Sequence, residues 1–278
     1  MQGNWRKVTE GESGVAAILG QPPYGTYAPN SLQRVLIALS QKTVLRRGVF
    51  RARMTRLILA LGQGKLDIRF RNAAFRIYGE RNLIEYGLLL VPEYNRADID
   101  FLLADAPADA AFVDIGCNIG LYALPLAAAR PKGRVLGIDA NPRMIAQIGW
   151  NAAAGGQTNL TLTHAAVSDR DGSADLVIRK DDVAIVAIEE SDSGTMPVRT
   201  LAALVAEAGI TRIHGLKIDI EGHEDRALVP FLDGCAPDLL PRRLRPPRLP
   251  PPAPHPEQFA LPPRALIRPR RGQAPSGD

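Results

Sequence analysis

The ten residues AFVDIGCNIG at 111–120 decide the fold of this chain. A short apolar run that begins at Ala111 contains Asp114. Gly116 and Gly120 then bracket a turn, and the segment LYALPLAAA follows with helical spacing. This pattern predicts a buried strand, a glycine turn and a helix. We expect the turn to point free backbone N–H groups into a crevice at the helix N-terminus, a place suited to an adenosyl ligand.

A second carboxylate completes this candidate site. Asp139 ends the next apolar run, VLGID, so it is expected at the end of the neighbouring strand, where it can accept both hydroxyls of a ribose. The middle of the turn is Asn118, where a dinucleotide fingerprint has the glycine that lets backbone approach a pyrophosphate. Asp114, Gly116, Asn118, Gly120 and Asp139 are therefore predicted to bind a ligand with a sulfonium and no phosphate.

A later block makes the prediction more specific. VDIGCNIG at 113–120 and LKIDIEGHE at 216–224 resemble the two signature blocks of the FkbM family of S-adenosylmethionine-dependent methyltransferases, V-D-x-G-x-N-x-G and I-K-x-D-x-E-G-x-E. The intervening segments GIDANP, AAVSDRDG and VRTLAAL fit as well, although Ala202 stands where members often have an acidic residue. The resemblance covers about residues 85–235. It implies a Rossmann-like methyltransferase fold with S-adenosylmethionine as cofactor.

The resemblance also suggests the acceptor and the catalytic residues. The acceptor is expected to be a small molecule or glycan, methylated on a sugar or secondary-metabolite hydroxyl. Asp219 and Glu221 are two residues apart, so on an extended strand they face the same way, and either is a candidate base or substrate anchor. His223 is a rival. No cysteine lies near them in sequence, and we expect no metal site.

Two alternatives remain open at this point. One is a nucleotide-cofactor oxidoreductase, which Asn118 in the turn disfavours. The other is a catalytically dead remnant that binds the donor but lacks the last strands of the sheet.

Charge is distributed unevenly along the chain. The net charge of +5 conceals a basic segment at 31–80, with eleven Lys or Arg against two acidic residues, and an acidic one at 81–240, with thirteen against twenty-three. An acidic catalytic region argues against a nucleic-acid substrate, because phosphate binding needs a basic face. There is no apolar run long enough to cross a bilayer, no secretion signal and no cysteine framework, so we expect a cytoplasmic protein.

The sequence divides into three predicted parts. Residues 1–84 form a helical and hairpin extension, 85–240 form the methyltransferase domain, and 241–278 form a Pro/Arg-rich disordered tail, either genuine or the product of a frame shift. In the extension, 31–62 reads as a helix pair capped by Ser31 with a basic face. The pair either packs on the domain as a solvated surface or makes peripheral contact with a membrane or partner. DIRFRNAAFRIYG at 67–79 predicts a hairpin.

The domain itself is predicted to be α/β, with a doubly wound, mostly parallel sheet that is truncated at its C-terminal edge. The expected strands are 111–115, 134–138, 160–166 and GLKIDI at 215–220, with an antiparallel pair at 175–180 and 183–190. The strand that carries LKIDIEG is expected beside the glycine-turn strand, at the topological switch point where ligands bind. The expected helices are 120–130, 142–154, 200–208 and 223–232.

Overall fold

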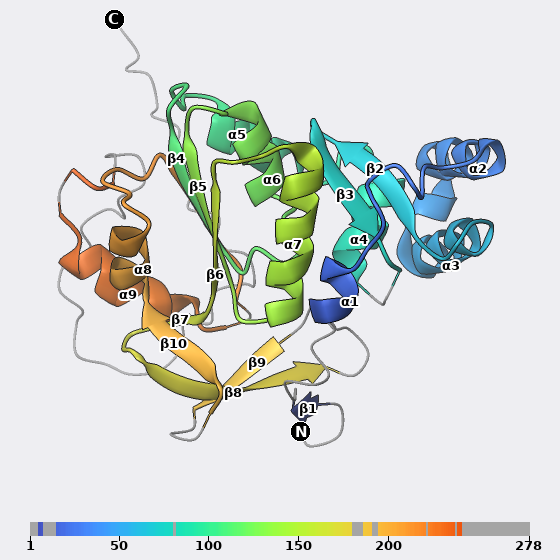
Figure 1. Cartoon of the computed structure of the whole chain (residues 1–278). Coiled ribbons are helices and arrows are strands. Elements are labelled where there is room, and N and C mark those ends of the chain that lie inside the picture. Colours follow the sequence, from blue (N-terminus) through green and yellow to red (C-terminus); the bar gives the residue numbers. More distant parts are fainter. Residues whose placement is uncertain are drawn as a thin grey trace, which may run out of the picture.

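The computed structural model describes residues 5–7, 15–79, 82–179, 186–190, 194–220, 222–236 and 238–240 of the 278-residue chain. Within these residues, strands and helices alternate around a central parallel sheet (Figure 1). Glu221 and the segment 241–278 lie outside the described residues.

Four parallel strands form the central sheet, in the order β11-β4-β5-β6. β4 (Ala111–Ile115), β5 (Arg134–Asp139) and β6 (Leu160–His164) are consecutive neighbours, whereas β11 (Gly215–Ile218) pairs with the other side of β4. The strand order therefore reverses beside β4, the kind of position at which open α/β sheets bind ligands. The predicted strands at 111–115 and 134–138 are confirmed, as is the pairing of the LKI strand with the glycine-turn strand.

Helices cover both faces of this sheet, which confirms the doubly wound α/β prediction. Adjacent residues of a strand point to opposite faces. Phe112 accordingly lies in one apolar cluster with α6 and α7, and Val113 in a second cluster with α8 and α9. Among the described strands, β11 is one edge of the sheet. The four helices are α6 (Ala123–Ala129), α7 (Pro142–Gly155), α8 (Leu201–Glu207) and α9 (Glu224–Gly234).

A second sheet, mostly antiparallel, lies across the end of the central sheet where β6 leads into β7 (Figure 1). The strand predicted at 160–166 is interrupted at Ala165, whose N–H donates to the carbonyl of Asp139 before the chain leaves to pair with β10. The predicted antiparallel excursion is present as β8 and β9. The strands of this sheet are β1 (Trp5–Lys7), β7 (Ala166–Ser168), β8 (Gly172–Arg179), β9 (Val186–Glu190) and β10 (Met196–Thr200).

The N-terminal part of the chain packs beside α7 and adds to the first apolar cluster. The predicted hairpin is confirmed, and its two-residue turn places Arg71 and Asn72 at positive φ, as a tight hairpin turn requires. The predicted helix pair is also present. The elements are α1 (Val15–Leu19), α2 (Ser31–Lys42), η2 (Val44–Arg46), α3 (Gly48–Ala60), β2 (Leu66–Phe70), β3 (Ala73–Ile77), α4 (Leu83–Leu90) and α5 (Arg96–Leu103).

The start of α2 differs from the prediction by one residue. Asn30, and not Ser31, is the N-cap: its side chain accepts the N–H of Gln33, and the Gln33 side chain accepts the N–H of Asn30. This reciprocal capping box satisfies two N–H groups at once, which a single serine cap cannot do.

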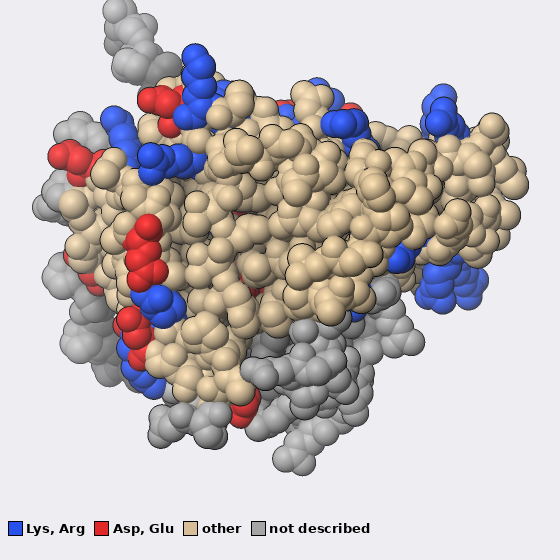
Figure 2. Space-filling view, viewed as in Figure 1, with Lys and Arg blue, Asp and Glu red and all other residues tan. Residues whose placement is uncertain are grey.

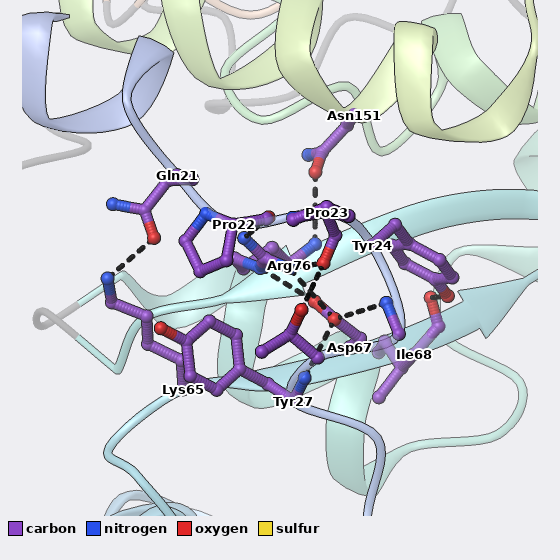
Figure 3. A network of polar contacts seen from close by, with 12 residues as sticks. Gln21, Pro22, Pro23, Tyr24, Tyr27, Lys65, Asp67, Ile68, Arg76 and Asn151 are labelled. Atoms are coloured by element: carbon purple, nitrogen blue, oxygen red, sulfur yellow. Dashed lines mark hydrogen bonds and ion pairs between the residues drawn. The ribbon is translucent and has the colours of Figure 1, made fainter.

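The buried side chain of Arg76 binds the segment before α2 to the β2–β3 hairpin (Figure 3). Arg76 is fully buried and forms a two-bond ion pair with Asp67, at 2.7 Å and 2.9 Å. Its guanidinium also donates to the carbonyls of Pro22 and Pro23, and it lies 4.0 Å from the ring of Trp150 on α7. One cation therefore joins three separate parts of the chain, with all its charge compensated.

Candidate functional site

The glycine turn between β4 and α6 satisfies its own N–H groups. The N–H groups of Gly116 and Cys117 both donate to the carbonyl of Ile138 at the end of β5. Those of Ile119 and Gly120 go to the side chain of Asn118 and to the carbonyl of Cys117. The expectation of free N–H groups pointing into a crevice is therefore wrong, because the neighbouring strand supplies acceptors that the sequence alone does not show.

Asp139 is the centre of this arrangement. One carboxylate oxygen accepts the N–H of Asn118 at 2.8 Å, and the other accepts the N–H of Asn141 at 2.8 Å. The side chain lies at the carboxyl end of β5, with the residue only 7% exposed. Burial raises the pKa of Asp139 to about 6, although these two N–H groups and the ammonium of Lys217 act in the opposite direction.

Asn118 is held by the N-terminal part of the chain. It adopts a left-handed conformation, with φ of 50°, and is buried. Its side-chain oxygen accepts a hydrogen bond of 2.9 Å from the amide of Asn82, the residue that also caps the N-terminus of α4. The side chain of Asn118 therefore shapes the turn, and α4 is attached directly to the candidate site.

Asp114 and Lys217 form a buried ion pair between β4 and β11. The lysine ammonium lies 3.2 Å from the carboxylate and donates to the carbonyl of Gly116 at 2.7 Å. The other oxygen of Asp114 accepts the N–H of Ala123 at the start of α6. Burial acts to lower the pKa of Lys217, but the carboxylates of Asp114 and Asp219 outweigh it and the pKa is raised. Lys217 therefore remains charged.

Gly116 allows β11 to approach the turn closely. A Cβ atom at this position would lie 2.1 Å from the carbonyl oxygen of Asp219, and φ is 71°. A side chain there would push the end of β11 away from β4. The glycine is thus the contact point between the two sequence blocks.

The candidate catalytic residues follow β11 in a loop that leads into α9. Asp219 is exposed, and its N–H continues the ladder with the carbonyl of Ile115. His223 is the N-cap residue of α9 but makes no side-chain capping bond. Glu224 accepts the N–H groups of Ile220 and Gly222, at 3.1 Å and 2.9 Å, and so fixes the loop. β11 ends at Ile218, so Asp219 and Glu221 come after the strand. The prediction that they face the same way on an extended strand therefore has no support.

Two residues near the turn were missed by the sequence analysis, Lys217 and Asn82. The signal for Lys217 was available, because parallel pairing of the two blocks sets it opposite Asp114. Asn82 had no comparable signal, since its contact with Asn118 joins positions far apart in the sequence.

The comparison with family models identifies the class. The model described as Methyltransferase FkbM domain matches residues 114–246, which include the end of β4, the glycine turn, β5 and β11. Residues 114–246 are thus similar to an FkbM methyltransferase domain. S-adenosylmethionine is the cofactor of this class of enzyme. Comparison with curated protein sequences gave no match.

Solved structures similar to this chain include two methyltransferases. One is TYW2 from M. jannaschii in complex with AdoMet, with 15% identity, a TM-score of 0.29, and coverage of 36% of this chain and 42% of that one. Another is a SAM-dependent methyltransferase from Agrobacterium tumefaciens, with 17% identity, a TM-score of 0.29, and coverage of 36% and 32%. The chain spans less than half the length of either structure. The fold assignment rests on the strand order described above.

Proposed function

We propose that this protein transfers a methyl group from S-adenosylmethionine to a hydroxyl group of a sugar or secondary metabolite. The single observation that carries the proposal is the joining of Asp139 to the glycine turn through the N–H of Asn118. It sets a buried carboxylate at the carboxyl end of β5, next to the turn and next to the switch point of the sheet.

The residues at this edge fit the donor. Each oxygen of Asp139 accepts one N–H, so each has a further lone pair for a ribose hydroxyl. The turn has no spare N–H from Gly116 to Gly120, so it offers no cradle for a pyrophosphate. A ligand with hydroxyls and a positive centre, but without phosphates, matches this set. The same feature counts against the nucleotide-cofactor oxidoreductase.

The residues of the chain have a limited task in the reaction. S-adenosylmethionine, when bound, supplies a methyl group that its sulfonium already activates. The protein must hold the acceptor oxygen in line with that methyl group and exclude water. The acceptor hydroxyl must also lose its proton, and Asp219, at the end of β11 beside Gly116, is our first candidate for that base. Glu221 and His223 are the other candidates.

We propose the cytoplasm as the site of action. Cys117 and Cys235 are free, as a reducing compartment would keep them.

The test of donor binding is calorimetry with S-adenosylhomocysteine and, in parallel, NAD. We expect S-adenosylhomocysteine to bind and NAD not to bind. Asp139→Ala should weaken S-adenosylhomocysteine binding by about 1.5–3 kcal/mol, the cost of losing hydrogen bonds to a charged group. Asp109→Ala, at an exposed position, is the matched control and should bind like the parent. If a correctly folded Asp139→Ala variant bound S-adenosylhomocysteine as tightly as the parent, Asp139 would not belong to the donor site.

The acceptor class needs a separate experiment. Sugars and secondary-metabolite alcohols can be screened with methyl-labelled donor, and transfer to oxygen recognised from the mass and stability of the product. Labelling only of amines or thiols would contradict the proposed hydroxyl acceptor while leaving the donor site intact.

A further inference from the structure

Helix α2 exposes three apolar side chains and buries two polar ones, while Leu36 and Ile37 pack against the core. Leu32, Val35 and Leu39 are 54%, 62% and 51% exposed, and their spacing sets them along one side of the helix. Gln33 and Ser40 are buried, at 2% and 0% exposed. A helix whose outer face meets only water shows the opposite pattern. The exposure of α2 therefore indicates that its outer face meets something other than water.

The next helix extends the same surface. On α3, Val49, Phe50 and Leu57 are exposed, with Arg53 and Arg56 exposed among them. We call the exposed side of α2, η2 and α3 the α2–α3 surface; its apolar members are Leu32, Val35, Leu39, Val44, Val49, Phe50 and Leu57. The three elements pack against one another, and exposed apolar groups gathered on neighbouring elements mark interaction sites.

The α2–α3 surface carries charge of a single sign. Between residues 31 and 66 there are eight Lys or Arg and no Asp or Glu. None of the basic side chains of α2 and α3 forms an ion pair with any residue in the part of the chain that the structure describes. Figure 2 shows basic side chains above and below a broad uncharged surface at the end of the molecule formed by these two helices. The complementary surface must therefore be apolar and negatively charged.

We propose that the α2–α3 surface docks the protein on an anionic lipid bilayer. Apolar side chains enter the boundary between headgroups and acyl chains, and the arginines around them contact lipid phosphates and carboxylates. The contact is peripheral: none of the helices in the described ranges is long and apolar enough to span a bilayer. The cytoplasmic leaflet, which carries anionic lipids, has the required charge.

The positive charge of the α2–α3 surface favours an anionic bilayer over a second copy of the chain as its binding partner. Two copies docked through the same surface would bring two sets of arginines together, which like-charge repulsion opposes. An acidic partner protein would match the charge, and the experiment below separates it from lipid.

Helix α4 links the α2–α3 surface to the candidate methyltransferase site. The side chain of Gln41 at the end of α2 donates to the carbonyl of Leu89 in α4. At the other end of α4, Asn82 donates to Asn118 in the glycine turn. The surface is thus built on the helix that contacts the turn, although its binding to lipid does not depend on methyl transfer.

The experiment is cosedimentation of the full-length protein with vesicles of phosphatidylcholine alone and of phosphatidylcholine with 30% phosphatidylserine. We expect binding only to the anionic vesicles, weakening as salt is raised. Arg53→Glu with Arg56→Glu should lower the partition coefficient at least a hundredfold, because the two reversals change the charge by four units and each unit near an anionic surface contributes about fivefold. The matched control, Lys132→Glu with Arg212→Glu, reverses two exposed charges elsewhere and should lower it far less.

Two further variants keep the result specific to lipid and to this surface. Val35→Ser with Leu39→Ser leaves the charge unchanged and should lower vesicle binding at least tenfold, since two exposed apolar groups no longer enter the bilayer. Arg242→Glu with Arg248→Glu reverses two charges in the basic segment 241–278 and should have a much smaller effect than the change at Arg53 and Arg56.

Three outcomes would overturn the proposal. The first is no binding to anionic vesicles by folded protein. The second is binding that depends on charge but is unchanged by Val35→Ser with Leu39→Ser, which would indicate a site for acidic proteins or other polyanions. The third is a dimer in light scattering that those serine substitutions dissolve, which would show that a second copy covers the surface.

Discussion

The ammonium of Lys217 and the carboxylate of Asp114 face each other directly across two parallel strands. They are register partners of β11 and β4, lie 3.2 Å apart and are both buried. The lysine belongs to the LKIDIEG block and the aspartate to the VDIG block, which are far apart in the sequence. This ion pair therefore joins the two blocks by which the family is recognised.

Replacing Lys217 by methionine should destabilise the protein by about 3–5 kcal/mol. The substitution leaves the buried carboxylate of Asp114 without its counter-ion, which costs more than the pair itself contributes. Urea unfolding followed by circular dichroism measures the change. The control is Arg226→Met, which removes the partner of Asp169 in an exposed pair at 3.6 Å and should cost less than about 1 kcal/mol. Similar losses of unfolding free energy in the two variants would show that the buried pair matters no more for stability than the exposed one.

Binding of S-adenosylhomocysteine should weaken as the pH falls through about 6. Burial raises the pKa of Asp139 to about 6, so below that pH the side chain becomes neutral and loses one acceptor for the ribose hydroxyls. The ligand prefers the carboxylate, so the dissociation constant should rise by up to tenfold for each pH unit below the pKa and level off above it. Calorimetry from pH 5 to pH 8 measures this. In Asp139→Asn the dependence should disappear, and an unchanged pH profile in that variant would assign the titration to another group.

Asp219→Asn and Glu221→Gln should separate catalysis from donor binding. If one of the two is the base, turnover with an accepted hydroxyl substrate should fall by about 10²–10⁴-fold in that variant. The affinity for S-adenosylhomocysteine should barely change, since Asp139 and the glycine turn are intact. Asp225→Asn, at an exposed position in the first turn of α9, is the control for a lost charge nearby.

Two results would contradict this catalytic assignment. Parent-like turnover in both variants would show that the carboxylates are structural and that the proton leaves by another route. Loss of donor binding in both would show that they shape the cofactor pocket, and His223 would then be the next candidate for the base.

Arg76→Met should release the segment before α2. The change leaves Asp67 buried without its cation, at a cost of about 3–5 kcal/mol. It also removes the bonds to the carbonyls of Pro22 and Pro23, so chymotrypsin should cut first at Tyr24 or Tyr27 in this segment. Arg96→Met removes an exposed arginine with two acidic partners and serves as the control. Protease resistance like that of the parent would show that other contacts hold the segment.

The parts of the structure that could be predicted from the sequence are those set by short-range patterns. The apolar runs before Gly116 and through Asp139 predicted β4 and β5, because a buried strand needs only a few consecutive apolar residues. The hairpin followed from alternation around a two-residue turn. The family resemblance supplied the pairing of β11 with β4 and the candidate site.

What could not be predicted depends on contacts between distant residues. The carbonyl of Ile138 takes two N–H groups of the turn because β5 ends beside it, and the sequence does not give that position. The exposure of three apolar residues on α2 could not be predicted for a similar reason. Gln33 is buried because its amide reaches the carbonyl of Ile58 on α3, and this contact directs the apolar residues beside it outward.

The glycine turn, with its N–H groups already bonded, is preorganised for the donor that we propose it binds. Loops that become ordered only on binding lose conformational entropy at that moment, and their affinity is reduced accordingly. Here the backbone from Gly116 to Gly120 is held by β5, by Asp139 and by its own side chain and carbonyl groups. Donor binding then has no loop to fold at this point, and discrimination among acceptors is left to the loop after β11, where Asp219 is exposed.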